Sequence, residues 1–471
     1  MLFNSLAFLI FLPVVFALYW LVRQRRLQNL TVVVASYVFY GWWDWRFLVL
    51  IAFTSLCSFG SGLLLDHFEG SRLRRQAVSA ANIIVNLGIL AIFKYYNFFV
   101  ENLDALLSAT LNCHLDWVTL QVVLPVGISF YTFQALSYSI DVYRGDIRAT
   151  RDPAAFFAYI SFFPQLVAGP IERATNLLPQ FQQSRRFDHD KAIDGMRQML
   201  WGFVKKIVVA DSCAQTVNMF WNDYASLDGL SLLMLALLFT LQIYCDFSGY
   251  SDIAIGCARL FGFNLKRNFN YPYFSQSIAD FWRRWHISLM TWMRDYIYIP
   301  LGGNRQGEWK TLRNIFIVWT VSGLWHGAAW TFVCWGLYHA VLLAVGRHTI
   351  VHGRPTPSRL KTLLQTLLTF TLVLIGWIIF RAESMSQAIG FIAQMFTALP
   401  GSHIPAFGKN CLLCGLLVTG IEWLQRDKQH ALQFSGFPFN HRWTRWAVYY
   451  ALLVLIALNV GKEQTFIYFQ F

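Results

Sequence analysis

Two stretches decide the fold of this chain: residues 271–305, YPYFSQSIADFWRRWHISLMTWMRDYIYIPLGGNR, and residues 322–340, SGLWHGAAWTFVCWGLYHA. Each contains a histidine that directly follows a tryptophan, His286 in the first and His326 in the second. His286 lies in a charged, amphipathic segment, whereas His326 lies in an apolar one. An ionisable side chain in an apolar segment is costly to bury and is a candidate for function.

The composition predicts a membrane protein. The chain has 471 residues, of which 56% are hydrophobic, 17% aromatic and only 13% charged. Soluble domains are about 45–50% apolar and about 25% charged. A chain this apolar cannot cover its surface with polar groups in water. We therefore expect an all-α polytopic membrane protein.

The formal net charge of +13 does not indicate nucleic-acid binding, because the basic residues are not gathered on one face or in one tail. They recur in short clusters between apolar runs, as positively charged cytoplasmic loops do. The clusters are Arg23, Arg25 and Arg26; Arg72, Arg74 and Arg75; Arg144, Arg148 and Arg151; Lys266 and Arg267; and Arg347, Arg354, Arg359 and Lys361.

The apolar runs predict about ten or eleven membrane crossings, some of them tilted or re-entrant. A spanning helix needs about 20 apolar residues. The candidate spans are residues 5–22, 28–42, 47–65, 79–99, 118–140, 194–214, 230–250, 314–345, 362–380, 410–424 and 445–461.

The first run has no basic residue before it and three arginines after it, unlike a cleavable signal peptide. We expect an uncleaved span with an extracytoplasmic N-terminus. The loop at 100–117 then also lies outside. No repeat or long linker divides the chain, so we expect a single domain over residues 1–471.

Two segments indicate that the bundle encloses a cavity. Residues 154–170 contain Pro164, Gly169 and Pro170 between basic flanks, which predicts a re-entrant segment. In residues 241–262 the polar side chains of Asp246, Ser248 and Asp252 interrupt an apolar helix. Either these carboxylates pair with arginines such as Arg283 or Arg284 and lock the bundle, or a glycine-broken helix borders a site there.

Residues 278–296 have the apolar spacing of an amphipathic helix, which we expect in the cytoplasmic interface with its tryptophans at headgroup level. His286 falls on the boundary between the polar and the apolar face. Such a histidine is either an interfacial hydrogen-bonding group or part of a reaction centre.

His326 lies between Arg313 and Arg347, both of which we expect on the cytoplasmic side. The 33 residues between them span roughly 50 Å as helix, about 25 Å each way, so two full crossings of a core about 30 Å thick do not fit. The chain should break around Gly327 and place His326 deep in the protein. Either His326 is catalytic, or it is a neutral histidine that bridges helices.

A buried neutral imidazole is suited to acyl transfer. It can deprotonate an acceptor hydroxyl that attacks a thioester, or carry the acyl group itself. A second histidine can orient the first or stabilise the oxyanion. The sequence contains no HExxH, Walker loop or GxSxG motif. The Cys411–Cys414 pair begins an apolar run without a redox-motif context, so we expect no metal site and no bound cofactor.

These motifs resemble the membrane-bound O-acyltransferase (MBOAT) superfamily, and within it the bacterial alginate O-acetyltransferase branch. The matching stretches are ASYVFYGWWDW (35–45), FKYYNFF (93–99), LPVGISFYTFQALSYSIDVYRGD (124–146), FFPQLVAGPI (162–171), YCDFSGYSDIAIG (244–256), residues 269–305, GLWHGAAW (323–330), FRAES (380–384) and FIYFQF (466–471).

The resemblance implies a helical bundle around a central funnel, with His326 as the active-site histidine and His286 as the second motif histidine. It implies O-acetylation of an exported polysaccharide, with a cytoplasmic thioester, acetyl-CoA, as the donor. It also implies a bacterial inner-membrane location among lipids. An SGNH-type periplasmic partner and the polysaccharide synthesis and export machinery would complete the system. Substrate-binding or channel-lining candidates are Asp246, Ser248, Asp252, Gln276, Arg283, Arg284, Trp285, Trp325 and His339.

The motifs do not choose the acceptor, because alginate, cellulose, peptidoglycan and teichoic acid relatives share them. Two other functions remain open. An acyl carrier protein could be the donor and dock on the basic helix 280–294. A transporter would also use broken helices and buried carboxylates, although we find no paired halves.

Overall fold

The computed structural model describes residues 1–111, 124–167, 169–349, 358–399, 408–434, 439, 441–461 and 464–467. These residues form helices and connecting turns, without a strand among them. The all-α class is therefore confirmed. The chain divides into two compact units, one built mainly from residues 1–188 and the other mainly from residues 189–471.

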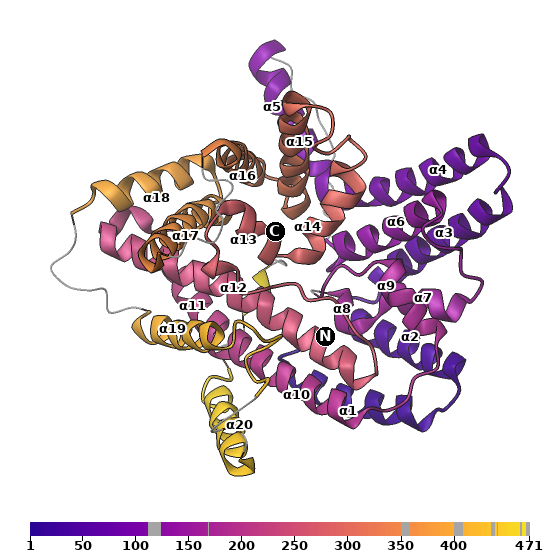
Figure 1. Ribbon diagram of the computed structural model, residues 1–471. Coiled ribbons are helices and arrows are strands. Elements are labelled where there is room, and N and C mark those ends of the chain that lie inside the picture. Colours follow the sequence, from indigo (N-terminus) through magenta and orange to yellow (C-terminus); the bar gives the residue numbers. More distant parts are fainter. Residues whose placement is uncertain are drawn as a thin grey trace. The chain divides into compact units, whose positions relative to one another are not determined.

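In the part of the chain that the structure describes, the first unit has ten helical elements. Helices α3, α4 and α6 pack against one another, and α2 packs against α7 (Figure 1). Its elements are α1 (Leu6–Leu21), α2 (Arg25–Gly41), α3 (Phe47–His67), α4 (Arg72–Leu90), the π-helix η1 (Ala91–Tyr95), α5 (Tyr96–Leu111), α6 (Ile128–Arg144), α7 (Pro153–Ser161), α8 (Phe163–Leu166) and α9 (Ala174–Gln182).

The second unit contains both motif histidines. Its elements are α10 (His189–Phe203), the π-helix η2 (Val204–Ala210), α11 (Asp211–Phe220), η3 (Tyr224–Ser226), α12 (Gly229–Leu260), η4 (Pro272–Phe274), α13 (Ile278–Arg284), α14 (Ile287–Met293), the π-helix η5 (Arg294–Tyr298), α15 (Glu308–His326), α16 (Trp330–Thr349), α17 (Arg359–Arg381), α18 (Met385–Thr397), α19 (Lys409–Leu424) and α20 (Arg442–Ala457).

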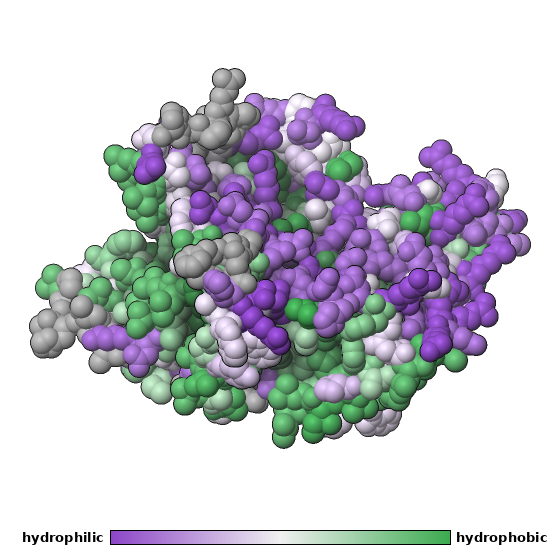
Figure 2. Space-filling view, turned by 60° about the horizontal axis from the view of Figure 1, so that its bottom comes forward, coloured by the Kyte–Doolittle hydropathy of each residue, from purple (hydrophilic) through white to green (hydrophobic). Residues whose placement is uncertain are grey.

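Within the described residues, four helical stretches are long and apolar enough to cross a membrane: Phe47–His67, Arg72–Leu111, Gly229–Leu260 and Arg359–Arg381, with the shorter Leu6–Leu21 also apolar. Hydrophobic residues cover large patches of the visible surface in Figure 2. Exposed leucines recur along α17, such as Leu360, Leu364 and Leu368. An apolar surface of this kind is stable against lipid. The number of ten or eleven crossings stays a prediction.

Two local predictions were wrong, and one of two alternatives is excluded. Helix α12 runs unbroken through Gly249, which excludes the alternative of a glycine-broken helix in residues 241–262. The loop predicted at 100–117 is helical up to Leu111, and its remainder lies outside the described residues. The single amphipathic helix expected at 278–296 is broken at Trp285 and His286 into α13 and α14.

Two pairs of glycines bring α10 and α12 into close backbone contact. A Cβ added at Gly202 would lie 2.6 Å from the carbonyl oxygen of Gly249, and one added at Gly195 would lie 2.6 Å from that of Gly256. Each pair is seven residues from the next along both helices, so the two backbones touch at successive points. Small residues permit this close packing between apolar helices.

Replacing Gly249 with alanine is therefore expected to push α10 and α12 apart, because the new Cβ would lie 2.8 Å from the Gly202 carbonyl oxygen. Overpacking of this kind costs about 1–3 kcal/mol. We expect a lower melting temperature for the purified protein in detergent. Gly88→Ala on α4 is the matched control, since a Cβ there meets nothing within 4 Å. Equal melting temperatures for the two variants would contradict the glycine contact.

Helices α15 and α16 form the break predicted near Gly327: α15 ends at His326 and α16 begins at Trp330. Gly323 and Gly336 let the two helices meet, because a Cβ on either would clash with a carbonyl oxygen of the other helix. This contact fixes the end of α15 and thereby the position of His326.

Candidate active site

The backbone break between α13 and α14 places His286. This residue adopts a left-handed conformation, with φ 45° and ψ 51°, which is uncommon for a residue other than glycine. Two backbone hydrogen bonds pin the break to the preceding segment: Asn270 N–H donates to the Arg284 carbonyl at 2.9 Å, and Ile287 N–H donates to the Asn268 carbonyl at 2.9 Å. The imidazole consequently leaves the helix surface and is buried, with 1% exposure.

Asn268 determines the tautomer of His286. The backbone N–H and the hydroxyl of Ser288 both donate to the side-chain oxygen of Asn268, at 3.2 and 2.9 Å. A backbone N–H can only donate, so the atom it faces is the amide oxygen. The His286 Nδ1 atom lies 3.2 Å from that same oxygen. Nδ1 must therefore carry the proton, which leaves the lone pair of the neutral ring on Nε2.

Burial keeps His286 neutral by lowering its pKa to about 3. Its ring packs edge-on against Phe247, with the centroids 4.7 Å apart. A neutral imidazole with this tautomer accepts a hydrogen bond or a proton at Nε2. It does not donate one there, so in this state it does not serve as an oxyanion donor through that atom.

We expect His286 to make stability fall with decreasing pH. Its folded pKa lies below its unfolded value near 6.5, so from about pH 6.5 down to pH 3 the unfolded state binds a proton that the folded state does not. The melting temperature of the wild type should fall more steeply between pH 7 and pH 4.5 than that of His286→Gln. His189→Gln, which changes an exposed histidine, is the control. A wild-type slope equal to that of His286→Gln would contradict the burial of a neutral His286.

Trp325 joins the two motif histidines. Its ring centroid lies 5.8 Å from that of His286 and 5.0 Å from that of His326. His326 is itself 6% exposed and also packs edge-on against Trp335 and Phe380, at 5.1 and 5.2 Å. The structure thus brings both His286 and His326 against one buried indole, as parts of a single aromatic cluster.

His339 belongs to the same aromatic cluster. Its Nδ1 accepts a hydrogen bond from the indole N–H of Trp282 at 3.2 Å, and its ring packs 5.0 Å from that of Trp335. A Cβ added at Gly376 would lie 2.9 Å from its Nε2 atom, so α17 passes very close. These contacts hold the indoles around His326 in place. We therefore interpret His339 as a positioning residue.

Asp246 and Asp252 are held by lysines, so the alternative in which they pair with arginines such as Arg283 or Arg284 is excluded. Lys206 Nζ lies 2.8 Å from Asp246 Oδ1, and Lys205 Nζ lies 2.5 Å from Asp252 Oδ2. Both lysines are in the π-helix η2, whose wider turn is a deviation often found at functional sites. The two successive lysines reach different carboxylates of α12.

Lys205 and Lys206 each hold a second carboxylate from a different helix. Lys205 also lies 3.5 Å from Glu422 of α19, and Lys206 lies 2.8 Å from Asp211 of α11. Glu422 in addition accepts a hydrogen bond from the Tyr244 hydroxyl at 2.6 Å. The sequence reasoning missed these lysines and Glu422, although charges in the apolar runs 194–214 and 410–424 were an available signal.

A narrow pocket lies between this charge network and the segment that holds His286. It encloses about 310 Å³ of empty space including its mouth. Its lining includes Lys205, Asp252 and Glu422 of the charge network and also Asn268, which holds His286. The predicted residues Ser248 and Asp252 thus line a pocket, whereas Asp246 is buried against Lys206.

The other predicted site residues lie elsewhere. Gln276 and Arg283 are exposed at the surface, and Arg284 forms an ion pair with Asp280 at 3.1 Å. Trp285 is buried and packs against Phe281 at 5.5 Å, as part of the aromatic cluster next to the break between α13 and α14.

A family model for MBOAT, the membrane-bound O-acyltransferase family, matches residues 147–385, which include all three histidines of the cluster. The chain belongs to the membrane-bound O-acyltransferase family. It is therefore a membrane enzyme of the acyltransferase class, and the transporter alternative falls away.

Three relatives show the range of this family. The chain is 43% identical to "Probable alginate O-acetylase AlgI" of Pseudomonas aeruginosa, over 84% of this chain and 75% of the relative. It is 33% identical to the peptidoglycan O-acetyltransferase of Helicobacter pylori, over 93% of this chain and 87% of the relative. It is 28% identical to the teichoic acid D-alanyltransferase of Bacillus subtilis, over 55% of this chain and 69% of the relative. The resemblance predicted from the motifs is confirmed.

Proposed function

We propose that this acyltransferase transfers acetyl groups from a cytoplasmic thioester, acetyl-CoA, for O-acetylation of an exported polysaccharide of the alginate or cellulose type. The observation that carries the proposal is the position of His326, which is buried at the end of a helix within a cluster of aromatic rings. The relatives named for O-acetylation of alginate and of peptidoglycan support acetyl as the group transferred.

In this proposal His326 acts at the thioester carbonyl. As general base it takes the proton of the acceptor hydroxyl, whose oxygen attacks the carbonyl carbon. The carbon–sulfur bond breaks, and the departing thiolate takes the proton from His326 and leaves as the free thiol. As acyl acceptor, an imidazole nitrogen attacks the same carbon, the carbon–sulfur bond breaks, and the thiolate takes the ring proton and leaves as the thiol. The acceptor hydroxyl then attacks the acetyl-imidazole, takes the acetyl group and returns its proton to the ring. In this proposal, neutral His286 has its lone pair on Nε2 and accepts a hydrogen bond next to His326.

We place the enzyme in the bacterial inner membrane with its N-terminus outside and its donor side inside. The acetyl group then crosses toward the periplasm, where an SGNH-type partner and the polysaccharide machinery complete transfer to the polymer. The arginine clusters that follow the first span support this orientation.

The donor assay tests the proposal. The purified protein is placed in lipid vesicles with radiolabelled acetyl-CoA, and the release of free coenzyme A thiol is measured. We expect thiol release that depends on the protein and increases when a polysaccharide acceptor and the partner are added. An intact thioester under all of these conditions would refute acetyl-CoA as the donor.

An acyl carrier protein is the second candidate donor, because the D-alanyltransferase relative shows that a similar protein is named for an acyl group other than acetyl. The basic surface expected for carrier docking is partly neutralised, because Arg284 pairs with Asp280 and Arg294 with Asp295. Adding an acyl-loaded carrier protein in place of acetyl-CoA in the same assay separates the two donors. Turnover with the carrier alone would select this candidate.

A further inference from the structure

The first unit contains an arginine-rich pocket of its own. The N-terminus of α2 and the segment that leads into α7 meet there. The pocket opens to solvent and has an empty volume of about 1050 Å³ including its mouth. Its lining residues are Arg25, Arg26, Leu30, Ala149, Thr150, Arg151, Asp152, Pro153, Ala154 and Gln182.

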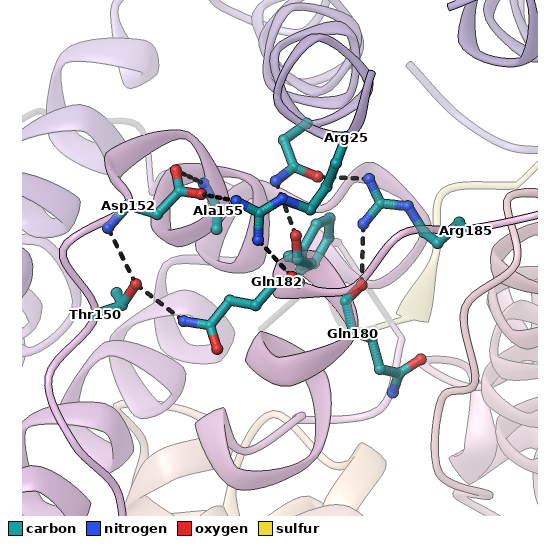
Figure 3. A network of polar contacts seen from close by, with 9 residues as sticks. Arg25, Thr150, Asp152, Ala155, Gln180, Gln182 and Arg185 are labelled. Atoms are coloured by element: carbon teal, nitrogen blue, oxygen red, sulfur yellow. Dashed lines mark hydrogen bonds and ion pairs between the residues drawn. The ribbon is translucent and has the colours of Figure 1, made fainter. Parts of the chain in front are cut away.

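Arg25 is held in a fixed position at this pocket. Its guanidinium donates to the backbone carbonyl of Gln182 and lies 3.2 Å from the Asp152 carboxylate, as Figure 3 shows. Gln182 in turn donates to the Thr150 hydroxyl at 3.0 Å, and that hydroxyl also accepts from the Asp152 N–H at 3.2 Å. The polar network therefore ties the α2 end to the α7 end.

The pocket has a net positive charge. Asp152 is the only carboxylate among the described residues that line the pocket, and it already accepts hydrogen bonds from Arg25 and from the N–H of Ala155, the latter at 3.1 Å. Arg26 and Arg151 are exposed. Helix α2 begins at Arg25, which lines the pocket, so the positive end of the helix dipole lies at the pocket. No described side chain caps this end. The pocket is therefore suited to a phosphate group.

An apolar stripe leads away from the same pocket. Leu30 lines the pocket, and Val34 and Val38 follow it along one face of α2. All three side chains are exposed, as expected of a face toward lipid. A ligand that fills the pocket with a phosphate and lies along this stripe has an anionic head and a hydrocarbon tail. A soluble phosphate compound would leave the stripe unused.

We propose that this pocket binds the headgroup of an anionic phospholipid, with the phosphate between Arg25, Arg26 and Arg151 and an acyl chain along Leu30, Val34 and Val38. Basic pockets at the ends of membrane helices recognise anionic lipid headgroups. Bound lipid would then link the N-terminus of α2 to the N-terminus of α7, because the arginines that contact it come from both segments.

The test compares two pairs of exposed arginines. In Arg26→Gln/Arg151→Gln the pocket loses two charges, while Arg25 and its contacts remain. The control, Arg72→Gln/Arg74→Gln, removes two exposed arginines of α4 that do not line the pocket. Native mass spectrometry of the full-length protein, titrated with phosphatidylglycerol in detergent, gives the affinity of the first bound lipid.

We expect the pocket variant to bind phosphatidylglycerol about 25-fold more weakly, because each arginine near an anionic lipid contributes a factor of about five. The control should change by less than about twofold, and zwitterionic phosphatidylcholine should bind weakly to all three proteins. Equal weakening in both variants, or none in the pocket variant, would refute the site. Displacement of the lipid by inorganic phosphate or by coenzyme A would assign the pocket to a soluble phosphate ligand and overturn the lipid proposal.

Discussion

His326→Ala is expected to lower the rate of acetyl transfer by about 10²- to 10⁴-fold, the usual contribution of a positioned general base. The variant should still fold and insert, because the aromatic rings around His326 also pack on one another. Trp335, for example, lies 5.3 Å from Phe380. The measurement is acetylation of the exported polymer in cells that carry the variant, together with thiol release by the purified protein.

Two further variants separate a catalytic role from a bridging one. His326→Gln keeps a polar side chain that can bridge helices but cannot take up a proton, so it should be as inactive as His326→Ala. His189→Ala removes an exposed histidine and should leave the rate unchanged. Full activity in His326→Gln would mean that His326 only bridges helices.

Rapid quenching decides between the two chemical roles. The wild-type protein is mixed with labelled acetyl-CoA for one turnover and quenched under conditions that preserve acyl-imidazole. Label on the protein that is absent from His326→Ala would assign His326 as acyl acceptor. Thiol release without labelled protein would assign it as general base.

The sequence predicted the part of the site that depends on local patterns. Apolar run length located most helices, and the distance between Arg313 and Arg347 predicted the break near Gly327, because the available helix was too short for two crossings. The Trp–His dipeptides indicated His286 and His326 as candidate site residues. These features depend on residue spacing along the chain, which a single sequence contains.

The contacts that fix the histidines could not be predicted in this way. The apolar periodicity of residues 278–296 continues across His286, so nothing local indicated the left-handed residue that follows α13. Asn268 lies 18 residues before His286 and holds it only after folding. The partners of Asp246 and Asp252 are lysines of the π-helix η2, a separate element of the chain, so local sequence patterns did not indicate them.

Lys206→Met is expected to destabilise the protein by about 3–5 kcal/mol, the cost of breaking a buried ion pair from one side. Lys206 is 1% exposed, and its ammonium lies 2.8 Å from both Asp211 and Asp246. It also donates to the Gln464 carbonyl at 3.2 Å. Methionine fills a similar volume but leaves two carboxylates buried without their cation. A large fall in the melting temperature of the purified protein in detergent measures this effect.

The double variant Lys206→Met/Asp246→Asn should recover part of the loss. The substitution removes one of the two uncompensated charges, while the asparagine oxygen can still accept the Ile467 N–H that Asp246 accepts at 2.8 Å. Lys310→Met, at an exposed position of α15, is the control and should melt with the wild type. A double variant less stable than Lys206→Met would show that the uncompensated charge of Asp246 is not the source of the loss. With the single variant Asp246→Asn added, the interaction energy of this cycle measures the coupling between Lys206 of the π-helix and Asp246 of α12.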